Sequence, residues 1–99
     1  MGGLSRSRPV VAAAARLGRN LSQMRRLLDL PAAVVAERAG ISTATLSRIE
    51  AGQPGVAVGS VLAVARALTL LDPLVAATDP YSTDIGRLRA DQALPKRIR

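Results

Sequence analysis

Residues 36–50 read AERAGISTATLSRIE, and they contain the signals for two short helices joined by a tight turn. Gly40 follows a run of helix-forming residues, and glycine readily adopts the left-handed backbone conformation that ends a helix. Ser42 comes two residues later, where its hydroxyl can accept a hydrogen bond from a free backbone N–H of the next helix. Leu46 and Ile49 are three residues apart and mark the buried side of that helix. The segment therefore predicts a helix, a short turn and a second helix capped by Ser42.

Regular spacing of apolar residues extends the helical prediction to both sides of this segment. Helices are predicted over 9–28 and 31–39, each beginning with a proline, which is favoured in the first turn of a helix. After a loop over 51–55, two more helices are predicted over 58–68 and 69–77, and the second of them is expected to start at Asp72-Pro73. The residues expected to be buried are Leu17, Leu21, Met24, Leu28, Val35, Ala36, Ala39, Leu46, Ile49, Val58, Val61, Leu62, Ala65 and Leu68.

The composition favours a small all-α protein. The chain has 99 residues, enough for one domain, and 48% of them are hydrophobic while only 1% are aromatic. Alanine, leucine and valine must fill the core, which favours close-packed helices over a sheet. We expect a flexible basic arm over 1–8, a compact domain over 9–79, and a basic tail over 80–99 that is partly helical over about 84–94.

The charge and the missing residue types restrict the function. Lys and Arg number 14 against 7 Asp and Glu, and the resulting net charge of +7 attracts polyanions. The chain has no Cys and no His, and its carboxylates have no paired spacing, so neither an enzyme nor a metal or cofactor site is expected. No apolar run is long enough to span a membrane. Because the apolar stretch 9–15 is also too short for a convincing export signal, we expect a cytoplasmic protein.

The helix after the tight turn carries a polar face suited to the major groove of DNA. Thr43, Ala44, Ser47 and Arg48 share the side opposite the buried residues. Small residues let the backbone approach the groove, and an arginine one turn later can reach a guanine edge. The alternative is an ordinary solvated helix face, but the turn and the positive charge favour base reading. RNA binding is less favoured, because Tyr81 is the only aromatic side chain available for base stacking.

Residues 17–71 resemble the lambda-Cro/repressor-like helix-turn-helix family, also called the XRE family. The matching landmarks are Leu17-Gly18, Leu21, Met24, Arg25, Leu30, residues 36–42, residues 46–52, Leu62 and residues 65–68. The resemblance implies an all-α, five-helix lambda-repressor-like domain that binds double-stranded DNA and whose third helix is the recognition helix. It also implies base contacts from Thr43, Ala44, Ser47 and Arg48, and a structural ion pair between Arg25 and Glu50.

The ion pair is also reasonable on physical grounds. A carboxylate at the C-terminal end of a helix is repelled by the helix dipole, so Glu50 favours a cation, and an arginine fork is the best partner. The alternative to the ion pair is that Arg25 contacts a DNA phosphate or is a free surface charge.

The sequence departs from the family at positions where phosphate is often bound. Pro31 and Ala32 stand where a polar pair is common, and Ala51 stands where a polar or basic residue is common. Contacts to the DNA backbone are therefore expected elsewhere. The candidates are Arg19, Arg26, Arg38, Ser42 and Thr45, with Arg6 and Arg8 of the basic arm as further possibilities.

The segment 60–71, SVLAVARALTLL, has too few polar residues for a surface helix. A helix this apolar is expected to be buried on more than one side. One interpretation is a homodimer, because a single helix-turn-helix reads few base pairs and a two-fold dimer matches a palindromic operator. The other interpretation is a helix that is simply central to the core.

The tail suggests a second function. Residues 52–56, 70–74, 84–89 and 94–99 are similar to small regulators of the HipB-type antitoxin class. This resemblance implies a HipA-like kinase toxin as partner, bound partly through 81–99, and repression of the shared operon. The residues alone leave three roles open for the charged side chains of the tail: they follow the DNA backbone, bind an acidic partner or remain free in solvent. These charges are Arg87, Arg89, Lys96, Arg97 and Arg99.

Two functions therefore remain open at the level of the sequence. The first is a transcriptional regulator, expected to be a homodimeric repressor that reads a palindromic operator through the helix at 42–50. The second is an antitoxin that neutralises a toxin and represses its own operon.

Overall fold

The computed structural model describes residues 6–93, which form six α-helices and one short 3-10 helix and contain no strand. The elements are α1 (Arg8–Leu27), α2 (Ala32–Ala39), α3 (Thr43–Glu50), α4 (Val58–Ala67), α5 (Leu71–Ala76), η1 (Pro80–Ser82) and α6 (Asp84–Ala93). The all-α prediction is confirmed, and every predicted helix bound lies within two residues of the observed one. Most of the predicted arm, 1–5, and the end of the predicted tail, 94–99 with Lys96, Arg97 and Arg99, lie outside the described residues.

Four helices end with the same backbone motif, in which one residue adopts a positive φ. These residues are Asp29 (φ 56°), Gly40 (φ 69°), Gly52 (φ 78°) and Thr69 (φ 62°). In each case the N–H of the next residue donates to a carbonyl near the helix end, as from Ile41 to Ala36 at 3.0 Å. This arrangement satisfies a carbonyl group that the last turn would leave free. Because Thr69 belongs to such a turn, the fifth helix begins at Leu71, inside the predicted span 69–77 and one residue before the expected start at Asp72-Pro73.

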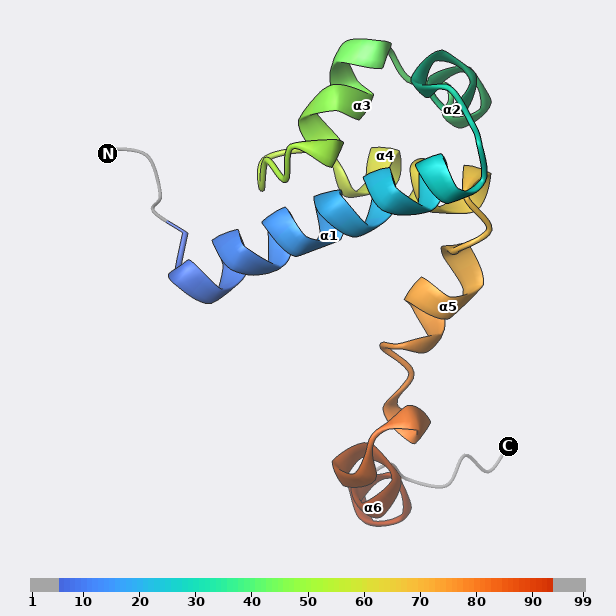
Figure 1. The fold of residues 1–99 in the computed structure, drawn as a ribbon. Coiled ribbons are helices and arrows are strands. Elements are labelled where there is room, and N and C mark those ends of the chain that lie inside the picture. The colour runs from blue at the N-terminus through green and yellow to red at the C-terminus, as the bar shows by residue number, and fades with distance from the viewer. Residues whose placement is uncertain (1–5, 94–99) are drawn as a thin grey trace.

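The core lies among α1, α2, α3 and α4 (Figure 1). In this core, α1 packs against α3, while α2 packs against both α3 and α4. The buried apolar residues are Leu21, Val35, Ala36, Leu46, Ile49, Val61, Val64, Ala65 and Leu68. This arrangement fixes α3 between α1 and α2, with its opposite side toward solvent.

Three residues predicted to be buried are exposed. Val58 is 73% exposed, because it lies at the edge of the buried face of α4, in the first turn. Leu17 is 36% exposed, since the first half of α1 extends beyond the other helices (Figure 1). Leu28 is 40% exposed and follows the last residue of α1. The predicted Leu62 is only half-buried, whereas Val64 is fully buried and was missed.

The C-terminal part of the described chain extends away from α1–α4 (Figure 1). The radius of gyration is 16.9 Å, compared with about 13 Å for a compact domain of 100 residues. The hydroxyl oxygen of Thr83 caps α6 by accepting a hydrogen bond from the Gly86 N–H at 3.0 Å. Among the described elements, α6 packs mainly against η1. None of the helices within 6–93 is long and apolar enough to cross a membrane.

Candidate nucleic-acid interface

The turn between α2 and α3 sets the direction of α3. Gly40 adopts the left-handed conformation, and a Cβ built on it would have no other atom within 4 Å, so glycine is needed there for its backbone alone. The side-chain oxygen of Ser42 accepts a hydrogen bond from the Thr45 N–H at 3.0 Å. This cap satisfies one of the free donors of the first turn and fixes where α3 begins.

The two sides of α3 differ sharply in exposure. Leu46 and Ile49 are 1% and 3% exposed and anchor the helix to the core. The four residues predicted to contact bases are all exposed. They are Thr43, Ala44, Ser47 and Arg48. A partner can therefore approach this side of α3 without any rearrangement of the core.

A row of hydrogen-bonded side chains runs along the exposed part of α3. The Ser42 hydroxyl donates to the Thr45 hydroxyl oxygen at 3.0 Å, and the Arg48 guanidinium donates to the same oxygen at 3.1 Å. Thr45 is half-buried, and its hydroxyl holds the Arg48 side chain in one direction. Sequence reasoning treated Thr45 only as a contact to the DNA backbone. The i, i+3 spacing of these three residues was the available signal for the row.

Arg25 and Glu50 form a two-point ion pair that ties α1 to the end of α3. The Arg25 Nε donates to Glu50 Oε2 at 2.7 Å, and Nη2 donates to Oε1 at 3.1 Å. A third bond, from Nη1 to the Leu30 carbonyl at 3.1 Å, adds the turn before α2. The hydrogen bond to Glu50 raises the pKa of Arg25 despite its partial burial. The pair thus joins three segments behind the exposed side of α3.

Two glycines allow α1 and α3 to approach each other closely. A Cβ on Gly18 would lie 2.6 Å from the Ile49 carbonyl oxygen and 2.7 Å from that of Glu50. A Cβ on Gly52 would lie 2.6 Å from Cα of Ala15. Because these neighbours are backbone atoms, no side-chain movement can relieve the contacts. Sequence reasoning used Gly18 and Gly52 only as landmarks of a resemblance and missed this role.

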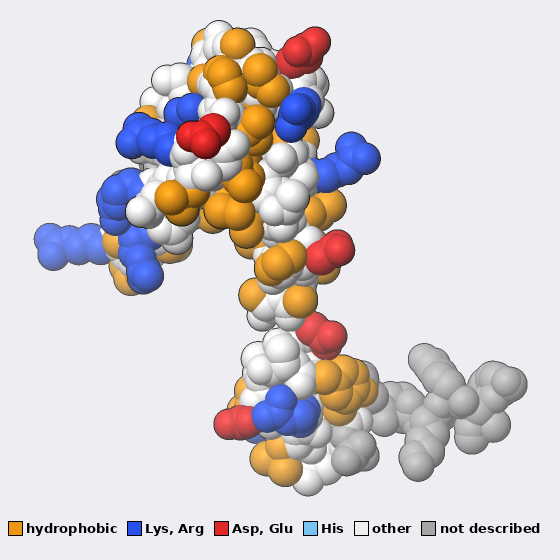
Figure 2. Space-filling model, turned by 45° about the vertical axis from the view of Figure 1, so that its right-hand side comes forward, with side chains coloured by type: hydrophobic (Ala, Val, Ile, Leu, Met, Phe, Trp, Pro, Cys, Tyr) orange, Lys and Arg blue, Asp and Glu red, His pale blue; other side chains and the backbone are white. Residues whose placement is uncertain are grey.

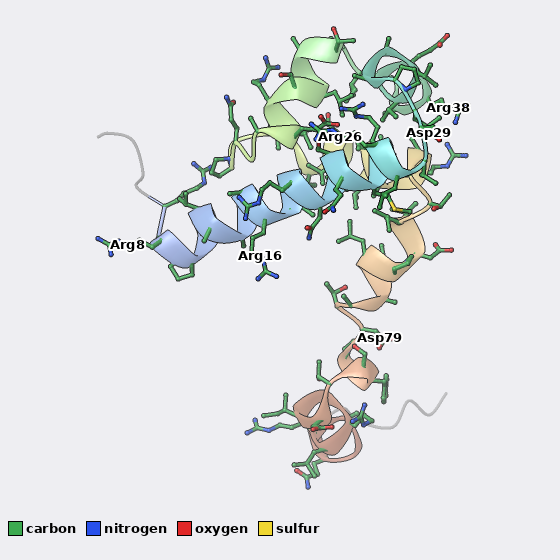
Figure 3. All side chains as sticks on the ribbon, in the orientation of Figure 1. Arg8, Arg16, Arg26, Asp29, Arg38 and Asp79 are labelled. Atoms are coloured by element: carbon green, nitrogen blue, oxygen red, sulfur yellow. The ribbon has the colours of Figure 1, made fainter. Side chains whose placement is uncertain are left out.

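The arginines predicted to contact phosphates are on the surface. Arg19, Arg26 and Arg38 are exposed, and Arg19 and Arg26 share one side of α1 because seven residues make about two helical turns. Arg38 lies on the outer side of α2, whereas Arg16 extends from α1 on the side away from α3 (Figure 3). Figure 2 shows several Arg side chains together on one side of the body formed by α1–α4. These exposed charges make the surface of α1 and α2 basic.

Comparison with known proteins gives one match. A family model described as a helix-turn-helix domain matches residues 16–78, which is more than half of the chain. The matched span includes α2, α3, α4 and α5 and most of α1, and it ends before η1 and α6. No curated protein and no solved structure matches the chain.

Proposed function

We propose that this chain, which belongs to the helix-turn-helix domain family and is a DNA-binding regulator, acts as a homodimeric repressor at a palindromic operator. In this proposal α3 lies in the major groove, with Thr43, Ala44, Ser47 and Arg48 against base edges. The observation that supports it most directly is the exposed side of α3, which is held from behind by Leu46 and Ile49.

Arg48 is the residue proposed to discriminate most between bases. Its guanidinium has five N–H donors, and only one hydrogen bond, to the Thr45 hydroxyl, is formed within the described residues. Enough donors remain for two parallel hydrogen bonds to a guanine edge. The Thr45 contact restricts the side chain before binding, which lowers the entropy lost when Arg48 meets its base.

Contacts to the DNA backbone are proposed to fix the register of α3. The residues in this role are Arg19, Arg26, Arg38, Ser42 and Thr45. A homodimer is proposed because one domain reads few base pairs, whereas two domains can read half-sites about 34 Å apart on one face of the duplex.

The test is Arg48→Ala, measured by binding to an operator obtained by selection from random duplexes. We expect a loss of about 1–3 kcal/mol on the operator and relaxed preference at one base position, with little change on random DNA. Arg66→Ala is the control, because Arg66 is exposed near the end of α4 and has no proposed contact with DNA. An equal loss on operator and random DNA would show that Arg48 does not read a base.

The antitoxin function is the second proposal, and the exposed apolar side chains of α6 are the observation that favours it. Ile85 and Leu88, both within the proposed toxin-binding segment 81–99, are more than 60% exposed. Removal of 81–99 would then abolish capture of a kinase-like toxin encoded by a neighbouring gene, while binding to the operator would survive. If the deletion leaves toxin capture unchanged, the segment is not the binding site.

A further inference from the structure

Three exposed arginines form a row along the length of α1, and we call them the basic row. They are Arg8, Arg19 and Arg26. Arg8 is 18 residues before Arg26, which is five full turns of an α-helix, and Arg19 is seven residues before Arg26, which is about two turns. The three side chains therefore lie on one side of α1. At 1.5 Å per residue the row spans about 27 Å.

The basic row points away from the core and flanks the side of α1 that contacts α3. Arg25 pairs with Glu50, and Gly18 lies against the backbone of α3, so these two residues mark the side of α1 that contacts α3. The row lies about 100° around the helix from Arg25, because Arg26 is the next residue. Leu21, which is 2% exposed in the core, is about 140° from Arg26. Because α1 packs against α3, the row and the exposed side of α3 are neighbouring parts of one surface.

Arg16 is an exposed arginine of α1 that does not belong to the basic row. It is nine residues before Arg25, which is about two and a half turns, so it lies opposite the contact with α3. Figure 3 shows its side chain on the side of α1 away from α3. Arg16 therefore has the charge and exposure of the row without its direction.

Arg8 does not contribute to the stability of α1 through its charge. The ion pairs among residues 6–93 join Arg25 to Glu50 and Arg87 to Asp84, and neither includes a member of the basic row. Arg8 is also the first residue of α1, where the positive end of the helix dipole disfavours a cation. A charge placed against a local rule, with no compensating contact in the described fold, indicates a role in binding.

The helix holds Arg8 in register with the other two arginines. The Val11 N–H donates to the Ser7 carbonyl at 3.0 Å, and Pro9 stands in the first turn, so α1 is already formed at Arg8. Figure 3 shows Arg8 at the end of α1 that extends beyond the other helices. Residues 8–15 precede the span 16–78 that the helix-turn-helix model matches. These two turns therefore add a rigidly held cation to the matched domain.

The spacing of the row fits a DNA duplex. Arg8 lies about 16 Å from Arg19 along the axis of α1. Phosphates of one strand are about 3.4 Å apart along the duplex axis, so this distance corresponds to about five base pairs. Cations in a row on one side of a helix suit the phosphates of a backbone, which position a protein without reading the sequence.

We infer that the basic row follows the phosphate backbone of duplex DNA, and that Arg8 contacts a phosphate beyond the base pairs that α3 reads. The inference rests on the proposed function and deepens it, because the first two turns of α1 lengthen the contact with DNA and add no contact to a base.

The first test measures binding of the full chain to a long random-sequence duplex as a function of salt concentration. We expect Arg8→Ala to reduce the magnitude of the slope of log K against log salt concentration by about 0.9, since one phosphate contact is lost. Arg16→Ala is the matched control and should leave the slope unchanged. Arg8→Lys keeps the charge and should keep the slope. No change with Arg8→Ala, or an equal change with Arg16→Ala, would overturn the inference.

The second test measures binding to a selected operator with long flanks and to the same operator trimmed to the base pairs that α3 reads. If Arg8 contacts a flanking phosphate, trimming removes its partner. We therefore expect the parent and Arg16→Ala to lose more affinity on trimming than Arg8→Ala loses. Equal losses for the three proteins would show that Arg8 does not reach beyond the half-site.

Thermal unfolding separates a loss of binding from a loss of structure. Arg8→Ala removes a cation from the positive end of the helix dipole and introduces a better helix former, so the unfolding midpoint should not fall. A midpoint below that of the parent would show that Arg8 stabilises the fold, which contradicts its assignment to DNA binding.

The inference and the proposed function fail in different ways. If Arg8→Ala leaves the salt slope unchanged while Arg48→Ala still relaxes the preference for one base, the role of Arg8 is wrong and the repressor proposal stands. If the slope changes as expected but no operator can be selected from random duplexes, the repressor proposal is wrong and the backbone contact stands.

Discussion

Arg25 connects α1 to the end of α3 and to the turn before α2. Its three hydrogen bonds reach Glu50 and the Leu30 carbonyl, and the paired side chains are only 14% and 16% exposed. Arg26, the next residue, has the same charge but is exposed. The difference comes from helix geometry, since a step of 100° turns one arginine toward α3 and the other toward solvent.

Removing Arg25 is expected to destabilise the fold strongly. Arg25→Met leaves the Glu50 carboxylate largely buried without a partner, at an expected cost of about 3–5 kcal/mol in the free energy of unfolding. Urea denaturation measures this loss. Arg26→Met, the exposed neighbour, is the control and should change stability by less than about 0.5 kcal/mol. Equal effects of the two substitutions would mean that the ion pair contributes nothing.

The raised pKa of Arg25 also sets the sign of its pH dependence. A raised pKa in the folded state means that the stabilising contribution is complete at neutral pH and is lost only when strongly alkaline solution deprotonates the guanidinium.

At the scale of the elements, the contact between α1 and α3 depends on the absence of a side chain. Gly18→Ala would force its Cβ against the carbonyl oxygens of Ile49 and Glu50, so we expect a loss of more than about 2 kcal/mol in unfolding free energy. Gly59→Ala in α4 is the matched control, because its Cβ would meet nothing within 4 Å. Since alanine favours a helix, this control should gain about 0.5 kcal/mol. Thermal unfolding of both variants measures whether Gly18→Ala lowers stability while Gly59→Ala raises it.

The end of α4 carries a residue that does not suit its backbone. Thr69 has a φ of 62°, a conformation that is unfavourable for a β-branched side chain. Thr69→Asn is therefore expected to stabilise the protein by about 0.5–1 kcal/mol, because asparagine tolerates this conformation. Gly40→Ala, at the same position of α2, should destabilise by about 1–2 kcal/mol. Denaturation midpoints that move in the same direction would contradict this explanation.

At the scale of the whole molecule, the excess of basic residues predicts DNA binding that weakens steeply with salt. Each phosphate contact contributes about −0.9 to the slope of log K against log salt concentration. Replacing Arg19, Arg26 or Arg38 by alanine should therefore reduce the magnitude of the slope by about 1 and weaken binding equally on all sequences. Arg66→Ala, tested as before, should leave the slope unchanged. An arginine whose removal does not alter the slope is not in contact with a phosphate.

The sequence predicted correctly those features that depend on residues close together in the chain. Gly40 and Ser42 marked the turn and the start of α3, because backbone conformation and capping depend on a few neighbouring residues. The spacing of Leu46 and Ile49 marked the buried side of α3. Val58 fits the same kind of spacing in α4 and yet is exposed, since burial requires a neighbouring element that the spacing does not reveal.

The sequence by itself determined the all-α class, the helix bounds to within two residues, and a face on α3 made of Thr43, Ala44, Ser47 and Arg48. These features follow from dihedral preferences, capping and periodicity, which act within a few residues. Only the tertiary structure decided the need for glycine at Gly18, the exposure of Val58 and the exposure of Ile85 and Leu88 on α6. These features depend on the distance between segments far apart in the chain, and that distance is set by packing.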